Sequence, residues 1–216
     1  MNYKAAKSKF IEWHVKTYGA KKLPVRSTIE HIVPRSILKS FGKSLDVDMH
    51  NFAIYPSRLN SMRGSKIMTD RIVFDDSLTL MSPSSGNSES WMSASQLDSA
   101  CFATSSAFVP GKEMRGRLAR SVAYMMHKIP TMSRAIHEQV LDVNTLVLWH
   151  HEHPITRMES ELDDFIHLVQ GDRNPIVKDP EFIWDAICEF RDLAKCGRRM
   201  FGRFDYGTHS FPKNTT

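Results

Sequence analysis

The chain changes its residue pattern about half-way along, and this change limits the folds that it can adopt. Two short runs rich in β-branched or aromatic residues, 26–33 and 51–55, occur in the first half and predict strands. From residue 115 onward, apolar residues recur at the spacing of amphipathic helices. Because no convincing linker separates the two patterns, we expect a single α+β domain over residues 1–216.

Other stretches predict further elements. We expect a helix over 3–18, a short helix or tight loop after Ser57 with that residue as N-cap, and a strand and turn over 71–80. Four helices are expected over 115–128, 140–151, 158–170 and 180–195. Residues 82–106 contain ten serines and predict a loop around one short strand at 100–109, and residues 205–216 predict a frayed tail.

Composition excludes several classes of protein. No apolar run reaches the length of about 18 residues that a membrane span needs. Three cysteines without a CxxC pair give no basis for a disulfide framework or a zinc ribbon. The first ten residues carry lysines but are followed by no apolar signal region, which favours an intracellular protein.

Positive charge is concentrated in the first third of the chain. Residues 1–75 hold 14 lysines and arginines against 6 acidic residues, a net charge of +8, whereas residues 146–216 have a net charge of −3. A basic lobe of this kind suggests a polyanionic partner, although a solvated basic face is the alternative.

Residue types that can bind a metal ion or transfer a proton occur around the two predicted strands. Glu30 and His31 are adjacent at the end of the first strand, where both side chains can turn toward one cavity. A carboxylate is a hard oxygen ligand, and an imidazole is a base with a pKa near neutrality. A surface pair of glutamate and histidine is the alternative for this dipeptide taken alone.

The segment after the second strand extends this pattern. Asp48 to Asn51 lie at the start of that strand, and Asn60 and Arg63 lie in the short helix that follows it. An Asn60 oxygen could bind a metal, and Arg63, one turn later, could face the same side and hold a phosphate. Strand, loop, strand and helix over 26–66 form the layout of a small metal-nuclease finger. An amide and an arginine on a solvated helix face are the alternatives.

In combination these stretches resemble the endonuclease I family of ββα-metal (His-Me finger) nucleases. The resemblance rests first on residues 30–34, 48–52 and 60–64. Further similar stretches follow in family order at 115–120, 123–125, 148–150, 154–156, Glu159, 170–177 and 179–181.

The resemblance implies a catalytic site. Glu30 and Asn60 would be the direct protein ligands of one Mg²⁺ ion, for which Mn²⁺ or another divalent ion could substitute. His31 would be the general base, oriented by a backbone carbonyl, and Arg63 would complete the catalytic set. Family products carry a 5′-phosphate and a 3′-hydroxyl. Three residues are expected to support the site from behind it, namely Asp48, His50 and Asn51.

The implied substrate is double-stranded DNA, cut with little sequence preference, with RNA left open. In relatives an arginine from the loop after the first strand holds the phosphate. Here that loop is Arg35 to Val47, and the candidates are Arg35, Lys39 and Lys43. Arg58 and Lys66 are expected to bind DNA as well. The alternatives are a site-limited homing-type endonuclease and a nucleic-acid-binding module without catalysis. Oligomeric state is not predicted.

A broad nuclease inside its own cell must be restrained, and a viral or phage product acting in a host cell would fit.

His150, His151 and His153 could bind zinc, but neighbouring helical residues diverge by about 100°, which favours a structural role.

Overall fold

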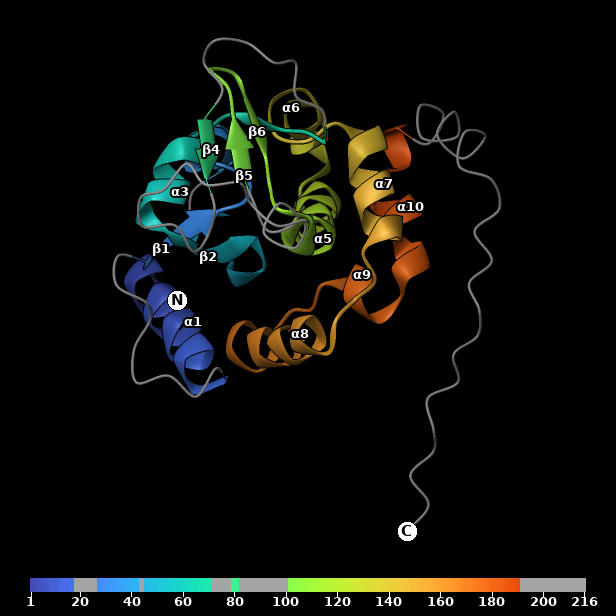
Figure 1. The fold of residues 1–216 in the computed structure, drawn as a ribbon. Coiled ribbons are helices and arrows are strands. Elements are labelled where there is room, and N and C mark those ends of the chain that lie inside the picture. The colour runs from blue at the N-terminus through green and yellow to red at the C-terminus, as the bar shows by residue number, and fades with distance from the viewer. Residues whose placement is uncertain (18–26, 43–44, 71–78, 82–100, 191–216) are drawn as a thin grey trace, which may run out of the picture.

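The structure is a computed structural model that describes residues 1–17, 27–42, 45–70, 79–81 and 101–190 (Figure 1). The first half contains the elements α1 (Tyr3–Thr17), β1 (Ser27–His31), α2 (Arg35–Phe41), the 3₁₀ turns η1 (Leu45–Val47) and η2 (Met49–Asn51), β2 (Phe52–Pro56) and α3 (Ser57–Arg63). Short strands follow at β3 (Ile67–Met68), β4 (Thr79–Met81), β5 (Cys101–Ala103) and β6 (Ala107–Val109).

The rest of the described chain is helical. Its elements are α5 (Lys112–Lys128), η3 (Pro130–Met132), α6 (Ser133–Gln139), α7 (Val143–Glu152), α8 (Arg157–Gln170), α9 (Pro175–Lys178), η4 (Pro180–Phe182), α10 (Ile183–Ala186) and η5 (Cys188–Phe190). Side-chain caps fix two of the longer helices. Asp142 accepts a hydrogen bond from the Thr145 amide at the start of α7, and Thr156 accepts one from the Glu159 amide at the start of α8. The predicted single α+β domain is confirmed.

The strands form two small sheets. β1 and β2 pair antiparallel, with Glu30 opposite Ala53 and His31 opposite Phe52. The second sheet has the order β3-β6-β5-β4, in which β3 and β6 are parallel and the other two pairs are antiparallel.

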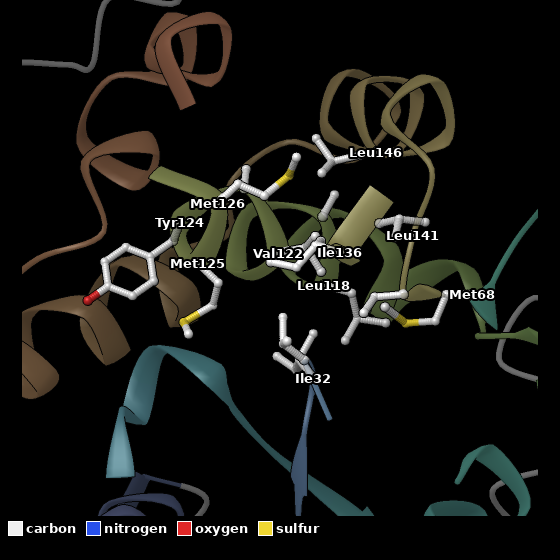
Figure 2. Close-up of a cluster of buried hydrophobic side chains, with 14 of the residues drawn as sticks. Ile32, Met68, Leu118, Val122, Tyr124, Met125, Met126, Ile136, Leu141 and Leu146 are labelled. Carbon is white, nitrogen blue, oxygen red and sulfur yellow. The ribbon is translucent and has the colours of Figure 1, made fainter. Parts of the chain in front are cut away.

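Helix α5 forms the centre of the main core and lies between the strands and α7 (Figure 1). The residues from Leu118 to Met126 are all buried. Ile32, directly after β1, points toward Leu118, Val122 and Met125 of this helix (Figure 2). Burial of these apolar side chains therefore anchors the end of β1, where Glu30 and His31 lie, to the most buried helix.

A second apolar cluster attaches α1 to the β1–β2 pair. Ala6 and Phe10 on one face of α1 are fully buried and belong to the same cluster as Ile29, Phe52 and Leu162. The Phe10 and Phe52 rings meet edge to face with their centroids 5.5 Å apart. The N-terminal helix is thus packed beside the strand pair that carries Glu30 and His31.

Several predicted boundaries are wrong, for physical reasons. The expected loop after residue 34 contains α2, whose Ile37 and Leu38 are buried by tertiary packing that the sequence pattern does not reveal. Pro56, not Ser57, is the N-cap of α3. The single strand expected at 100–109 is a hairpin of β5 and β6. The helix expected over 180–195 is broken into η4, α10 and η5 as far as residue 190.

Some expectations concern residues outside the described part of the chain. These are the greater part of the predicted strand at 71–80, the serine-rich stretch up to residue 100 and the tail at 205–216. Among the helices that the structure describes, none is both long and apolar enough to cross a membrane.

Candidate active site

The end of β1 is fixed by a local clamp that Asn51 provides. The Val33 amide donates to Asn51 Oδ1 at 2.7 Å, and Asn51 Nδ2 donates back to the Val33 carbonyl at 3.0 Å. The Ile32 amide also donates to the Asn51 carbonyl at 2.9 Å. Because these bonds hold both residues that follow His31, the direction in which the chain leaves β1 is set.

Glu30 and Arg63 form a buried ion pair between β1 and α3. Arg63 Nη1 donates to Glu30 Oε1 at 2.5 Å, and the two side chains are only 2% and 6% exposed. Burial raises the pKa of Glu30 to about 7, although the neighbouring Arg63 acts in the opposite direction. This carboxylate therefore needs positive charge close to it in order to remain ionised near neutral pH.

The other bonds of Arg63 go to the backbone. Its guanidinium donates to the carbonyls of His31 at 3.1 Å, Ile32 at 2.6 Å and Gly64 at 3.1 Å. The sequence predicted that this arginine holds a phosphate, but the structure places it inside the protein. The helical spacing correctly predicted that Arg63 and Asn60 share one side of α3. It could not predict that Arg63 is buried, because this burial depends on the packing of α3 against β1.

Asn60 lies on the same side of α3, against the backbone of β1. Its Nδ2 donates to Thr28 Oγ1 at 2.9 Å and to the Ile29 carbonyl at 3.2 Å. A carbonyl can only accept, so the amide nitrogen must point at β1 and the amide oxygen must point elsewhere. Within the described ranges, no hydrogen bond to Asn60 Oδ1 or Glu30 Oε2 is found.

These two oxygens suit a hard cation. Carboxylate and amide oxygens are ligands that Mg²⁺ accepts while it keeps several waters. A group of three or more histidine, cysteine, aspartate or glutamate side chains placed to hold a metal does not occur in the part of the chain that the structure describes. Within that part of the chain, His150, His151 and His153 form no such group. The pair of Glu30 and Asn60 is smaller than such a group, and an ion that keeps several waters can be held by two protein ligands.

His31 is held by a backbone carbonyl. Its Nε2 lies 3.0 Å from the Asp46 carbonyl oxygen. Since a carbonyl only accepts, Nε2 carries the proton and Nδ1 of the neutral ring carries the lone pair. Burial lowers the pKa of His31 below its usual value, which favours this neutral form. The arrangement leaves Nδ1 chemically able to accept a proton.

Arg35 lies close to His31, at the start of α2. It forms an ion pair with the Asp46 carboxylate at 2.6 Å, and its side chain is 46% exposed. Asp46 thus contacts both residues, because its carbonyl accepts from the His31 imidazole and its carboxylate pairs with the exposed Arg35 guanidinium.

The remaining predicted DNA-binding residues are more scattered. Lys39 on α2 and Arg58 on α3 are exposed, and Lys66 donates to the Met62 carbonyl at 2.8 Å. Lys43 lies outside the described residues.

Asp48 is the centre of a polar network behind the site. Its carboxylate accepts hydrogen bonds from the His50 amide at 3.0 Å, Gln170 Nε2 at 2.8 Å, Tyr124 at 3.1 Å and Lys128 Nζ at 2.6 Å. Gln170 also accepts from the Met49 amide at 2.9 Å. The network connects η2, and therefore the Asn51 clamp, to α5 and to the end of α8.

His50 belongs to the same network. Its ring lies 4.5 Å from the Tyr124 ring, and its Nε2 lies 3.3 Å from the Asp172 carbonyl. The sequence predicted a supporting role for Asp48, His50 and Asn51 but not the partners that the structure gives them. Tyr124, Gln170 and Asp172 lie in stretches that carried the family resemblance, whereas nothing in the sequence singled out Lys128.

A separate cleft of about 690 Å³ opens between α1, β2, α5 and the start of α8. Its lining includes Trp13, Tyr55, Arg117 and Met158. Glu30, His31, Asn60 and Arg63 do not line this cleft, so the candidate site and the cleft are distinct features.

Comparison with known proteins now identifies the group to which this site belongs. The Endonuclease I family model matches residues 18–181. The chain belongs to the endonuclease I family. It is therefore a nuclease, and nucleic acid is its class of substrate. The endonuclease I match includes β1, β2, α3 and α5, but it begins after α1. No curated protein matches the chain.

Proposed function

We propose that the protein hydrolyses phosphodiester bonds in double-stranded DNA, with His31 as general base and one Mg²⁺-type ion held by Glu30 and Asn60. The observation that carries the proposal is the pair of oriented side chains at the end of β1. His31 Nε2 is occupied by the Asp46 carbonyl, and the Asn60 amide nitrogen is occupied by β1. Both residues therefore present their remaining acceptor atom, Nδ1 in one case and Oδ1 in the other.

The proposed reaction follows from these atoms. Nδ1 of His31 takes a proton from a water molecule, whose oxygen attacks phosphorus in line as the bond to the 3′ oxygen breaks, and solvent water protonates the leaving 3′ oxygen. The products carry a 5′-phosphate and a 3′-hydroxyl. A bound Mg²⁺-type ion would neutralise charge on the non-bridging oxygen and on the leaving oxygen. Arg63 keeps the Glu30 carboxylate in place and ionised.

Arg35 is the residue that we assign to holding the phosphate, out of Arg35, Lys39 and Lys43. It is exposed, it is tied to the same residue that orients His31, and it begins the helix that follows β1. Lys39, Arg58 and Lys66 would add backbone contacts, which provide affinity without sequence information.

A plasmid-nicking assay tests the base. We expect His31→Ala to lower turnover by roughly 10²–10⁴-fold while DNA affinity stays nearly unchanged. His127→Ala is the matched control, because this histidine is exposed on α5 and lies outside the site. Cleavage by His31→Ala at a rate close to that of the control would end the assignment.

The metal is tested separately. EDTA should abolish cleavage, and Asn60→Ala should raise the Mg²⁺ concentration that gives half the maximal rate, whereas Ser61→Ala, an exposed neighbour on α3, should not. The protein should stay folded in EDTA, because two side chains cannot account for a core of this size. Unfolding on chelation would show that the ion is structural.

Substrate breadth requires its own measurement. The basic first third holds the candidate site, so binding should weaken with salt, with a log–log slope of about −0.9 for each phosphate neutralised. Sequencing the cut ends of a genomic duplex should reveal many unrelated sites. A single recurring site longer than about ten base pairs would favour the homing-type alternative. Binding without cleavage would favour the non-catalytic module.

A further inference from the structure

Helix α1 places an aromatic ring against the proposed base. The ring of Tyr3, the first residue of α1, stacks on the His31 ring with a centroid distance of 5.6 Å and an interplanar angle of 30°. Phe52 meets the same imidazole edge to face at 5.1 Å. The His31 ring thus has aromatic neighbours from two elements, α1 and β2.

The contact is part of a closed cycle of four residues. His31 donates to the Asp46 carbonyl at 3.0 Å, and the Asp46 carboxylate pairs with Arg35 at 2.6 Å. The guanidinium of Arg35 lies over the Tyr3 ring, 5.0 Å from its centroid, and Tyr3 returns to His31. Tyr3 therefore contacts both residues to which the proposed mechanism gives a direct role near the phosphate.

Anchors elsewhere hold α1 in place, so its docking does not depend on Tyr3. Asn2 Oδ1 caps the first turn by accepting from the Ala5 amide at 2.9 Å. Phe10 is fully buried in the cluster beneath the helix, and Trp13 stacks on Phe165 of α8 at 5.7 Å. Removing the Tyr3 ring should consequently leave the helix docked.

We propose that Tyr3 is a positioning residue of the nuclease site, holding the imidazole of His31 and the guanidinium of Arg35 in their working orientations. This inference rests on the proposed function. It goes beyond it because the family match begins at residue 18, after the end of α1. The helix thus adds to the site a contact that lies outside the matched region.

A positioning contact is needed because a single hydrogen bond leaves the His31 ring free to rotate. The bond from Nε2 to Asp46 fixes one point of the imidazole, but the ring can still tilt about that point. A ring stacked on its face opposes the tilt and keeps Nδ1 directed at the attacking water. Small misplacements of a reacting group are costly, and an error of about 1 Å can lower a rate about 100-fold.

The test compares three variants for kcat, KM and DNA affinity. Tyr3→Phe keeps the stacking ring and should stay within about twofold of the parent protein. Tyr3→Ala removes the ring and should lower kcat roughly 10–100-fold, with KM and DNA affinity changed much less. Trp13→Ala is the matched control, because it removes an aromatic contact of the same helix on the side of α8. It should lower the melting temperature but leave kcat close to that of the parent.

A second readout needs no activity. Ring currents from Tyr3 displace the carbon-bound proton resonances of the His31 imidazole, which can be assigned by comparison with His31→Ala. Tyr3→Ala should shift these resonances downfield, whereas Trp13→Ala should not. An unchanged His31 spectrum in Tyr3→Ala would overturn the stacking arrangement, even if the parent protein proved inactive and the proposed function failed.

Three kinetic results would also overturn the inference in an active protein. The first is a normal kcat for Tyr3→Ala. The second is a loss in Tyr3→Phe as large as that in Tyr3→Ala, which would assign the effect to the hydroxyl group. The third is an equal loss of kcat in Trp13→Ala, which would assign it to helix docking alone.

Discussion

Replacing Arg63 with methionine is the perturbation whose effect the structure defines best. The side chain is 2% exposed, and its guanidinium bonds to Glu30 and to the carbonyls of His31, Ile32 and Gly64. Methionine fills a similar volume but donates no hydrogen bond. Without a bound cation, Arg63→Met would leave the Glu30 carboxylate buried without a compensating charge.

The expected cost is large. Breaking a buried ion pair by removing one partner destabilises a protein by about 3–5 kcal/mol. In a chain of about 200 residues, each kcal/mol lowers the melting temperature by about 2–4 °C, so the total decrease should be roughly 6–20 °C. Glu30→Gln should cost less, because the amide oxygen still accepts from Arg63. The double variant should be more stable than the sum of the two single effects by about 0.5–3 kcal/mol.

Urea unfolding followed by tryptophan fluorescence measures the parent protein and all three variants, in EDTA at pH 8, where the Glu30 carboxyl of the parent protein is mainly ionised. Arg58→Met is the matched control, because Arg58 is exposed on the same helix. Its effect should stay within about 0.5 kcal/mol. An effect of Arg63→Met no larger than that of the control, or strict additivity in the double variant, would refute the ion pair as a source of stability.

Two further predictions concern stability away from the site. Glu159 binds Arg120 through both carboxylate oxygens, at 2.7 and 2.6 Å, and both residues are buried. Glu159→Ala should therefore lower the free energy of unfolding by about 3–5 kcal/mol. Glu161→Ala is the control and should cost much less, because Glu161 lies on the partly exposed side of α8. Urea titrations of the two variants measure the difference, and equal losses would contradict it. Burial lowers the pKa of His14 to about 4 and that of His150 to about 3, so unfolding takes up protons below pH 6.5. The contribution of these two histidines to the free energy of unfolding should be fully present above that pH. Toward pH 4 the free energy of unfolding should fall by up to about 1.4 kcal/mol per pH unit for each histidine. His150→Gln should make the decline shallower, and a flat profile in the parent protein would contradict this prediction.

The elements that the sequence predicted well are those with a strong local pattern. The observed α1, β1, β2 and α8 agree with the expected ranges to within about one or two residues. The chemistry of Glu30, His31 and Asn60 was also suggested locally, by residue type and order. Spacing along a helix or strand is a property of a few neighbouring residues, so it can be read without knowledge of the fold.

Burial and long-range contacts could not be predicted in this way. The position of Arg63 on α3 was predicted, but its depth depends on β1, which lies about 30 residues earlier in the chain. The short helix α2 exists because Ile37 and Leu38 pack into the core, and a run of seven residues carries too little helical signal by itself. The stacking of Tyr3 on His31 joins segments that have no relation in sequence.

The polar network around Asp48 has a consequence for the synthesis of the protein. The residues proposed to do the chemistry leave the ribosome early, but the side chains that hold Asp48 come 76 to 122 residues after it. During synthesis the N-terminal portion therefore lacks the contacts that fix η2 and, through Asn51, the end of β1. We expect fragments that stop before residue 170 to be poorly ordered and protease-sensitive at η2 and to cleave no DNA. The order of synthesis would thus delay nuclease activity until α8 has been translated.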